Sequence, residues 1–394
     1  EFRRVLFRSG EQSLSDYFGL PTKVAGYAHS SLWHRAYNLI WNEWFRDQNL
    51  QNSVTVDKGD GPDTPANYVL LRRGKRHDYF TSGLPWPQKG PAVPLPLGDQ
   101  APIKSDAADT TVNVSILNAS DAYRKLDTST NLLSTTSTVG VEADRLYADL
   151  SEATAATINQ IRQAFQIQKL YERDARGGTR YTEIVRSHFG VISPDARLQR
   201  PEFLGGGSTP IVVNPVAQTS SSDVTSPQGN LAAFGTVSAS GHGFTKSFTE
   251  HCVLIGLVSV QADLTYQQGL NRMWSRSSRW DFYWPALSHI GEQAVLSKEI
   301  FLDGTASDDD VFAYQERYAE YKYKPSLITG QMRSNAATSL DTWHLSQDFG
   351  TRPLLNAAFI EDNPPIDRVI AVPSEPHLLL DCFFKIGRAS CRER

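Results

Sequence analysis

The chain has 394 residues, 40% of them hydrophobic and 21% charged, with a formal net charge of −4 at pH 7. This apolar share can fill a sizeable core, but no run approaches the roughly 18 uninterrupted apolar residues of a membrane-spanning helix, so neither membrane insertion nor secretion is indicated. A globally acidic chain is a poor general binder of nucleic acid, so any contact with DNA requires a local basic patch.

The two ends of the chain look like translated sequencing adapter. One permitted codon choice for Glu1–Ser9 ends in GCTCTTCCGATCT, and its reverse complement opens one permitted choice for Lys385–Arg394 directly after a leading A. Protein termini have no reason to be complementary, whereas adapters ligated to both ends of a DNA fragment are. We therefore predict that residues 1–9 and 385–394 are artefacts. Without their seven basic and two acidic residues, the net charge falls from −4 to −9.

The first predicted element is a helix with an aromatic stripe. Large side chains recur at helical spacing, namely Leu32, Trp33, Ala36, Tyr37, Ile40, Trp41 and Trp44. Trp and Tyr combine a large apolar area with a polar tip, which suits contacts between subunits as well as packing inside one subunit. Both interpretations stay open, and Trp41 and Trp44 are candidate subunit-interface residues.

The segment from Arg72 to Gly90, RRGKRHDYFTSGLPWPQKG, concentrates basic and aromatic residues around a proline-punctuated turn. Basic side chains neutralise phosphates and aromatic faces stack unpaired bases, a mixture typical of sequence-tolerant binding to single-stranded nucleic acid. The same mixture is typical of protein interfaces with Arg and aromatic anchors. The candidate nucleic-acid-binding residues are Arg72, Arg73, Lys75, Arg76, Tyr79 and Phe80, and Trp86 is a candidate interface residue.

Residues 84–102 are expected to run extended along a surface, and residues 106–144 are not expected to form a core of their own. Six prolines between positions 85 and 102 exclude a long helix or central strand and impose an extended path, either as a loop or as an arm along a neighbouring subunit. The stretch from 106 to 144 is rich in Thr, Ser, Asn and Asp, with alternation of Val112, Val114 and Ile116 supporting one strand. We predict a surface insertion at about residues 100–145.

A helical hairpin is predicted at about residues 151–190. Ser151 is a plausible N-cap, an apolar face runs from 158 to 171, and Gly177 and Gly178 end the first helix. The second helix ends before Gly190, and its His188 is interpreted as a core or interface histidine rather than a metal ligand. Its apolar side is formed by Tyr181, Ile184, Val185 and His188.

Beyond residue 209 the pattern predicts short strands separated by long connections. The predicted strands are 211–216, 231–238, 251–263, 311–314, 366–372 and 378–384, of which 251–263 is the strongest because residues 253–257 are apolar on both faces. This set favours a mainly β sandwich with loop insertions and a few helices. Trp280 and Trp284, in a second cationic and aromatic cluster at residues 274–284, are further candidate interface residues.

The sequence nominates no catalytic chemistry. It contains no HExxH, zinc spacing, GxSxG or phosphate-binding loop, so we expect no enzyme activity, metal or cofactor. Asp303 and Asp308–Asp310 lack the ligand spacing of a calcium loop, and a solvated turn is favoured. Cys252 and Cys382 lie in apolar runs, which predicts buried free thiols rather than a disulfide and fits intracellular assembly.

Long blocks of the chain resemble the major capsid protein of gokushoviruses, members of the Microviridae with single-stranded DNA genomes. The resemblance runs from Leu14 to about Phe384 and includes RAYNLIWNEWFRDQNLQ at 35–51, YQERYAEYKYKPSLITGQMRS at 314–334 and NPPIDRVIAVPSEP at 363–376. It implies a viral jelly-roll β-sandwich, with residues 10–384 forming one domain that lacks its N-terminal strands. An incomplete jelly roll would leave unpaired edges and an exposed apolar face.

The same resemblance implies a structural function without catalysis. It predicts self-assembly into a small T=1 icosahedral shell around a circular single-stranded DNA phage genome, with the insertion protruding toward a host surface receptor. Implied partners are further copies of the chain, the genome and other virion proteins, and the implied location is the virion, assembled in the host bacterial cytoplasm. The alternative from another class is a β-rich carbohydrate-binding protein or glycoside hydrolase, in which Trp and carboxylate side chains line a sugar groove.

Overall fold

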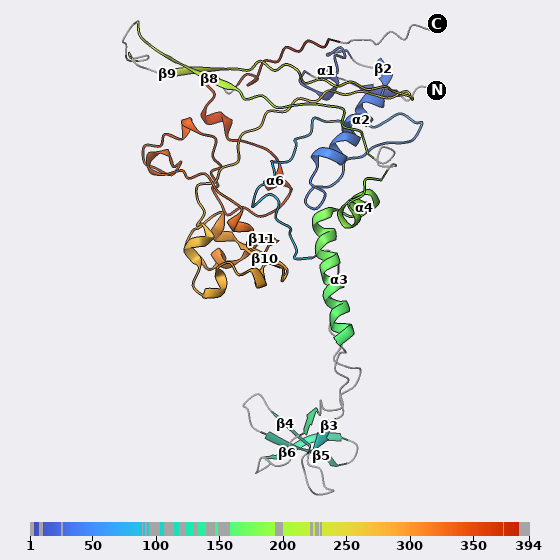
Figure 1. The fold of residues 1–394 in the computed structure, drawn as a ribbon, viewed down its shortest axis with the longest axis vertical. Coiled ribbons are helices and arrows are strands. Elements are labelled where there is room, and N and C mark those ends of the chain that lie inside the picture. The colour runs from blue at the N-terminus through green and yellow to red at the C-terminus, as the bar shows by residue number, and fades with distance from the viewer. Residues whose placement is uncertain are drawn as a thin grey trace. The chain divides into compact units, whose positions relative to one another are not determined.

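The computed structural model divides the chain into two compact units. Residues 1–85, 190–287 and 293–394 form the first unit, and residues 86–189 and 288–292 form the second (Figure 1). The structure describes residues 4–7, 11–24, 27–88, 90, 93, 103–105, 114–117, 123–129, 132–138, 146–148, 158–193, 200–220, 224, 228, 231–372 and 374–385.

The first unit contains the aromatic helix that the sequence predicts. Its α-helices are α1 (Leu14–Tyr17), α2 (Leu32–Ile40) and α6 (Ala357–Ile360), and α2 continues into a π-helical turn, Trp41–Phe45. Two buried amides bind this helix to the segment that follows it. Asn38 Nδ2 donates to the carbonyl oxygens of Thr55 and Asn67, at 3.0 and 2.9 Å, and Asn42 Nδ2 donates to Val54 O at 2.8 Å. The turn-rich segment is thereby held by side chains, since it has no sheet partner for its own carbonyls.

The main core of the first unit surrounds a two-stranded sheet, β10 (Glu292–Leu296) with β11 (Val311–Glu316). A neighbouring backbone joins β11 where Leu84 and Tyr314 exchange two hydrogen bonds of 2.8 Å. A Cβ placed on Gly83 would lie 2.5 Å from the Ala313 Cβ, so glycine permits this close approach. The buried core residues are Tyr79, Phe80, Tyr266, Val295, Ile300, Phe312, Ala313, Ala319, Phe359 and Ile360.

Two further antiparallel pairs belong to the first unit. The hairpin of β8 (Val212–Ala217) and β9 (Leu231–Thr236) runs in register from Val212–Thr236 to Ala217–Leu231 (Figure 1). The other pair joins β1 (Arg4–Phe7) to β2 (Tyr27–Ser30). β1 lies in the tail that we predict to be adapter-derived, and that hypothesis stays a prediction.

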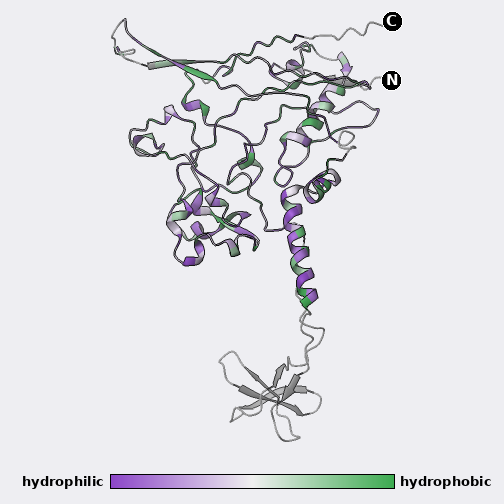
Figure 2. Ribbon diagram, viewed as in Figure 1, coloured by the Kyte–Doolittle hydropathy of each residue, from purple (hydrophilic) through white to green (hydrophobic). Residues whose placement is uncertain are grey.

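The second unit contains small antiparallel sheets and two helices. Its strands are β3 (Ile103–Ser105), β4 (Val114–Leu117), β5 (Tyr123–Ser129), β6 (Leu132–Thr138) and β7 (Leu146–Ala148), ordered β4-β5-β6 in one sheet and β3-β7 in another. Its helices are α3 (Ile158–Gly177) and α4 (Tyr181–Phe189). Figure 2 shows α3 as mainly hydrophilic, with hydrophobic residues at intervals. The N-cap predicted at Ser151 lies outside the described residues.

Polar contacts tie α3 to its surroundings within the second unit. His188 Nε2 of α4 lies 2.7 Å from Asp174 Oδ1 of α3, so the histidine that the sequence assigns to packing or an interface connects the two helices. Arg176 Nη2 lies 2.6 Å from each carboxylate oxygen of Glu292. A bidentate Arg–carboxylate pair of this kind fixes geometry as well as charge.

The chain is mostly non-helical, but several predicted strands have no partner. Residues 251–263, 366–372 and 378–384 form no strand in the part of the chain that the structure describes; Ile366–Arg368 is a short 3-10 turn. Leu254 and Leu257, in the stretch predicted to be apolar on both faces, are 51% and 43% exposed, and the Cys252 and Cys382 thiols, expected to be buried, are exposed. The alternation of apolar and polar residues predicts which side chains of a strand share a face. It does not predict which other segment of the chain pairs with that strand. The predicted thiol burial depended on that pairing and is wrong for this structure.

Candidate functional site

The basic segment is fixed at its centre by backbone hydrogen bonds. Gly74 N donates to Phe45 O at 3.2 Å, Lys75 N donates to Ile360 O at 2.8 Å, and Asp362 N donates to Arg73 O at 3.0 Å. These bonds place the segment against the C-terminal end of α6 and set which side chains turn inward. A Cβ on Gly74 would already contact the Ile360 side chain and Phe45 O, both at 3.5 Å.

Lys75 turns into the core rather than toward solvent. Its side chain is buried, and Nζ lies 4.3 Å from the centroid of the Phe359 ring, a cation–π geometry. Burial lowers the pKa of Lys75, while Asp362 and Asp78 act in the opposite direction. Lys75 therefore does not present its charge to a nucleic acid in this structure, contrary to the sequence interpretation.

Arg72 and Arg76 are exposed, whereas Arg73 is only partly exposed and its guanidinium lies 5.3 Å from the centroid of the Phe45 ring. Arg72 Nη1 donates to Asn363 Oδ1 at 3.0 Å, and Arg73 Nη1 donates to Ser259 Oγ at 2.8 Å. Arg76 Nη1 lies 3.0 Å from Asp263 Oδ1, and both of these side chains are largely exposed. A solvent-exposed ion pair contributes little and exchanges readily, so the Arg76 guanidinium stays available to an anionic partner.

Tyr79 and Phe80 are core residues. Phe80 is 4% exposed and packs edge-on against Tyr266, with ring centroids 5.0 Å apart. Tyr79 stacks on Tyr323 at 5.3 Å, and its hydroxyl donates to Glu299 Oε2 at 2.9 Å. Neither ring has a free face for an unpaired base, so the structure does not support their assignment to nucleic-acid binding. The sequence pattern missed this because aromatic composition does not distinguish a stacking platform from a core.

The second cluster does expose its aromatic faces. We call Trp274, Trp280, Phe282, Tyr283 and Trp284 the aromatic shelf; each is at least 45% exposed, and Trp274 reaches 71%. The Trp280 and Trp284 rings lie 6.3 Å apart, and the Arg279 guanidinium lies 4.1 Å from the Trp280 centroid.

Side chains beneath the shelf hold it in place. Arg276 lies 4.3 Å from the Tyr321 ring centroid and forms a 3.6 Å ion pair with buried Glu320. Tyr283 N donates to Tyr321 Oη at 3.2 Å, and Arg317 Nη2 donates to Trp280 O at 3.3 Å. The exposed rings are therefore presented on a supported backbone.

The other candidate interface tryptophans have different environments. Trp41 is buried, with Nε1 donating to Arg72 O at 2.8 Å, so it packs inside the chain and its assignment to an interface is not supported. Trp44 is half-exposed; its Nε1 donates to Pro201 O at 2.8 Å and Arg200 lies 4.3 Å above its ring. Trp86, in the second unit, is partly buried.

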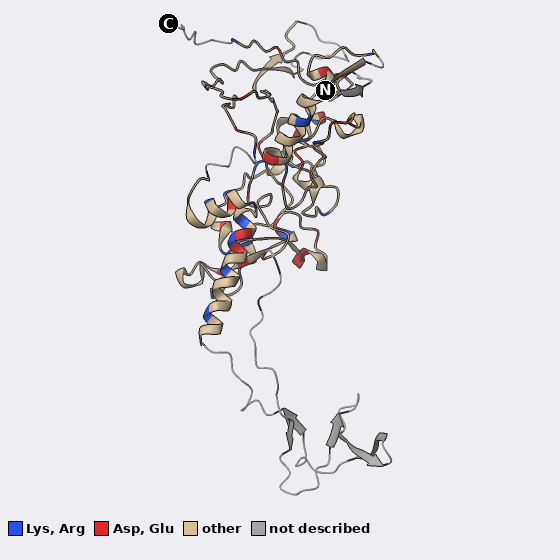
Figure 3. Cartoon of the chain, turned by 90° about the vertical axis from the view of Figure 1, so that its right-hand side faces the viewer, with Lys and Arg blue, Asp and Glu red and all other residues tan. Residues whose placement is uncertain are grey.

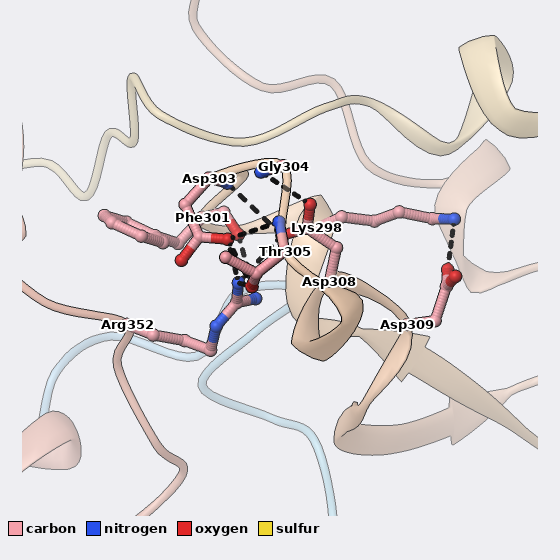
Figure 4. Close-up of polar contacts among 8 residues, drawn as sticks. All are labelled: Lys298, Phe301, Asp303, Gly304, Thr305, Asp308, Asp309 and Arg352. Atoms are coloured by element: carbon pink, nitrogen blue, oxygen red, sulfur yellow. Dashed lines mark hydrogen bonds and ion pairs between the residues drawn. The ribbon is translucent and has the colours of Figure 1, made fainter.

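The acidic turn at 303–310 is organised by Arg352 (Figure 4). Arg352 Nη2 lies 2.6 Å from Asp303 Oδ1 and 2.8 Å from Asp308 Oδ1, and Asp308 Oδ2 accepts from Gly304 N at 2.9 Å. These hydrogen bonds, from Arg352 first, lower the pKa of Asp308. The Arg352 guanidinium provides the positive charge that balances these carboxylates. The sequence favoured a freely solvated turn, whereas in the structure the turn is organised around Arg352. Its partner lies more than forty residues away, so no local pattern revealed it.

A second buried arginine, Arg35 of α2, pairs with a carboxylate from the segment that follows the helix. The Arg35 guanidinium donates to Asp63 from Nε at 2.6 Å and from Nη2 at a shorter distance, and Tyr68 Oη donates to the same carboxylate. The side chains of Arg35 and Asp63 are 6% and 1% exposed. Bonding from Arg35 first, and then from Tyr68, lowers the pKa of Asp63 to about 2.

Within the described ranges, no three His, Cys, Asp or Glu side chains gather as a potential metal site. None of the helices described there combines the length and apolar character of a membrane span.

Comparison with known proteins finds capsid proteins similar to most of the chain. The profile of a family described as "Capsid protein (F protein)" matches residues 9–390. Capsid protein VP1 of Bdellovibrio phage phiMH2K is 51% identical over 393 residues, covering 94% of this chain and 73% of the relative. Capsid protein VP1 of Chlamydia phage 1 is 44% identical over 446 residues, covering 95% and 75%. The corresponding protein of Spiroplasma virus 4 is 37% identical over 406 residues, covering 94% and 73%.

Proposed function

Since the chain belongs to the capsid protein (F protein) family, as a major capsid protein of the gokushovirus type, we propose that its copies close into a T=1 icosahedral shell around a circular single-stranded DNA genome. Its role is structural and not enzymatic, and its place is the virion. The match across residues 9–390 carries this conclusion. The carbohydrate-binding or glycosidase alternative is not supported, because each of these relatives is a capsid protein.

We propose that the folded subunit in the shell is a jelly-roll β-sandwich. Two features support this. The described sheets are small and antiparallel, and the apolar segments 251–263 and 378–384 have no regular secondary structure and mostly exposed side chains. Extended apolar segments gain free energy when strand pairing covers them.

The aromatic shelf is the surface of the first unit that best suits contact between copies. Its composition of Trp, Tyr, Phe and a stacked Arg is that of interface hot spots, in which large rigid side chains bury much area at little entropic cost. We assign Trp280 and Trp284 to this contact, with Trp44 and Trp86 as secondary candidates. Closed shells need such heterologous contacts at fixed rotations.

Replacing both Trp280 and Trp284 by Ala is expected to abolish shell formation while the subunit still folds. Each half-exposed indole contributes little to the folding stability of the isolated chain. Loss of an interface hot spot, in contrast, costs about 2 kcal/mol or more of binding free energy per contact, and every copy in the shell loses it. Sedimentation velocity and electron microscopy should show shells for the unmodified chain and slowly sedimenting species for the double variant.

A matched control is Trp343→Ala, which removes an equally large side chain that is 63% exposed and lies outside the shelf. It should leave assembly unchanged. Shells of normal yield from the Trp280→Ala/Trp284→Ala variant, with an unchanged circular dichroism spectrum, would contradict the assignment.

We propose that Arg72, Arg73 and Arg76 contact the genome. The three side chains lie within five consecutive residues, with Arg72 and Arg76 exposed and Arg73 partly exposed, although the chain as a whole is acidic. A local basic patch on an acidic protein is the arrangement that favours phosphate contact at one surface only.

Changing Arg72, Arg73 and Arg76 together to Gln is expected to weaken binding to single-stranded DNA and to reduce its salt dependence. Each lost phosphate contact lowers the slope of log K against log salt by about 0.7, so the slope should fall by about 2. Fluorescence anisotropy with a labelled oligonucleotide at several salt concentrations measures both quantities.

The control for this variant is the change of Arg162, Lys169 and Arg173 to Gln. These residues are exposed on α3, whose basic positions Figure 3 shows, and the change removes the same formal charge. Only the first variant should alter the slope. Equal losses from both variants would indicate a net-charge effect and contradict a localised site.

We propose that the insertion at about residues 100–145 meets a host surface receptor and that assembly takes place in the host bacterial cytoplasm with other virion proteins. The support is the gokushovirus-type relationship together with the polar composition of this stretch. Much of it lies outside the described residues.

A further inference from the structure

The helix α2 changes its geometry where it meets the basic segment. Over Trp41–Phe45 it is π-helical, and Arg46 N donates to Trp41 O, five residues back, at 2.9 Å. In an uninterrupted α-helix Trp44 would share the face of Tyr37 and Trp41, because residues three and seven positions apart lie on the same side. Those two side chains are each 8% exposed, whereas Trp44 is 48% exposed. The wider turn therefore brings this indole out of the buried stripe.

The Trp44 ring is held in one orientation although about half of it faces solvent. Its Nε1 donates to Pro201 O at 2.8 Å, and the Arg200 guanidinium lies 4.3 Å from the ring centroid. Arg200 is itself placed by a 2.8 Å hydrogen bond from Nη2 to Glu43 O. A ring that is fixed before binding loses little conformational freedom when a flat ligand stacks on it. Single π-helical turns are rare and occur frequently at functional sites, so a fixed, exposed ring on such a turn is a candidate platform for a ligand.

Three contacts join the π-helical turn to the basic segment. Trp41 Nε1 donates to Arg72 O at 2.8 Å, and Phe45 O accepts from Gly74 N at 3.2 Å. The Arg73 guanidinium lies 5.3 Å from the Phe45 ring centroid. Two residues of the turn, one before and one directly after the exposed indole, therefore fix the backbone that carries the arginines.

We propose that an unpaired base of single-stranded DNA stacks on the Trp44 indole while neighbouring phosphates contact the arginines of the basic segment. This inference rests on the proposed contact between those arginines and the genome. It adds the aromatic platform that Tyr79 and Phe80, which are buried in the core, do not provide. A cationic surface, an aromatic face and an Arg cation–π contact are the combination that binds single strands without sequence preference. A contact between copies, for which Trp44 is a secondary candidate, would not require the indole to adjoin the basic segment.

Fluorescence anisotropy of the purified chain with two labelled probes tests the proposal: an oligothymidylate and an abasic oligonucleotide with the same number of phosphates. Trp44→Ala should weaken binding of the oligothymidylate about 5- to 150-fold, which is the effect of losing one stacked base. Its affinity for the abasic probe and its salt slope should stay unchanged, because the indole carries no charge. Trp44→Phe, which keeps an aromatic face, should lose clearly less. Trp343→Ala removes a 63% exposed indole outside the turn and the basic segment, and as the control it should bind both probes like the unmodified chain.

The unmodified chain supplies a test that does not depend on the folding of any variant. It should bind the oligothymidylate at least about fivefold more tightly than the abasic probe, and equal affinities would overturn the proposal. Loss of shells in Trp44→Ala with unchanged DNA binding would assign the indole to contact between copies and overturn the stacking. An unchanged salt slope in the triple arginine variant would overturn the arginine contact, and the stacking proposal with it. An altered slope in that variant, together with normal oligothymidylate binding by Trp44→Ala, would overturn the stacking alone.

Discussion

Replacing Asp63 by Ala is expected to cost about 3–5 kcal/mol of the free energy of unfolding, because it leaves the buried Arg35 guanidinium without its counter-charge. Tyr68 would lose the acceptor of its hydroxyl in the same step. Urea denaturation followed by circular dichroism measures the loss. The control is Asp309→Ala, which removes an exposed carboxylate paired with Lys298 at 2.6 Å and should change the free energy by about 0.5 kcal/mol or less.

The pH dependence of the same variant gives a second check. Because the pKa of Asp63 is lowered to about 2 in the folded chain, its contribution is fully present above its ordinary pKa near 3.8 and is lost as the pH falls toward 2. The unmodified chain should therefore lose stability over this range by an amount that the variant does not show. A cost below about 1 kcal/mol for Asp63→Ala would contradict the assignment of a buried, desolvated pair.

Arg35→Met combined with Asp63→Leu separates two explanations of that cost. If the penalty of Asp63→Ala comes from the uncompensated charge, the apolar pair should restore most of the lost stability, because neither side chain then needs a partner. If it comes instead from the lost hydrogen bond of the Tyr68 hydroxyl, the double variant should remain as unstable as Asp63→Ala, because Leu offers that hydroxyl no acceptor.

The helices were accessible from the sequence because their signal is local. Aromatic spacing predicts a helix over α2 and the turn after it, although not the π-helical form of that turn, and apolar spacing with flanking glycines is consistent with α3 and α4. The segment at 251–263 has an equally strong pattern, yet it forms no sheet with the described residues, since a strand requires a partner elsewhere in the chain.

The sequence predicted which residue types gather in the candidate site, but not which of their side chains face solvent. Four cations were visible in the basic segment, but Lys75 turns inward because Phe359, almost 300 positions later, supplies a ring beneath it. The Arg352 cluster at the acidic turn likewise joins positions that are 44 and 49 apart. Long-range partners of this kind decide whether a charge is solvated, paired or buried, and a single sequence contains no direct signal for them.

Phe80 provides the sharpest distinction between a core and a DNA-binding role. Phe80→Ala is expected to lower the free energy of unfolding by about 3–5 kcal/mol, because it removes a fully packed ring and leaves a cavity beside Tyr266, Phe312 and Tyr323. Phe80→Leu, which retains most of the apolar volume, should cost clearly less. Chemical denaturation of both variants measures this order.

The decisive comparison is with affinity for single-stranded DNA, measured under conditions in which the variants remain folded. A core role predicts that Phe80→Leu binds DNA like the unmodified chain, since the side chain is 4% exposed and offers no face to a base. Phe282→Ala, which removes a 52% exposed ring, is the control for stability and should change the free energy of unfolding by much less. A stacking role would reverse the pattern: Phe80→Leu would weaken DNA binding by about 1–3 kcal/mol with little effect on unfolding. Because the ring makes four edge-to-face aromatic contacts, with Tyr79, Tyr266, Phe312 and Tyr323, we expect the first pattern.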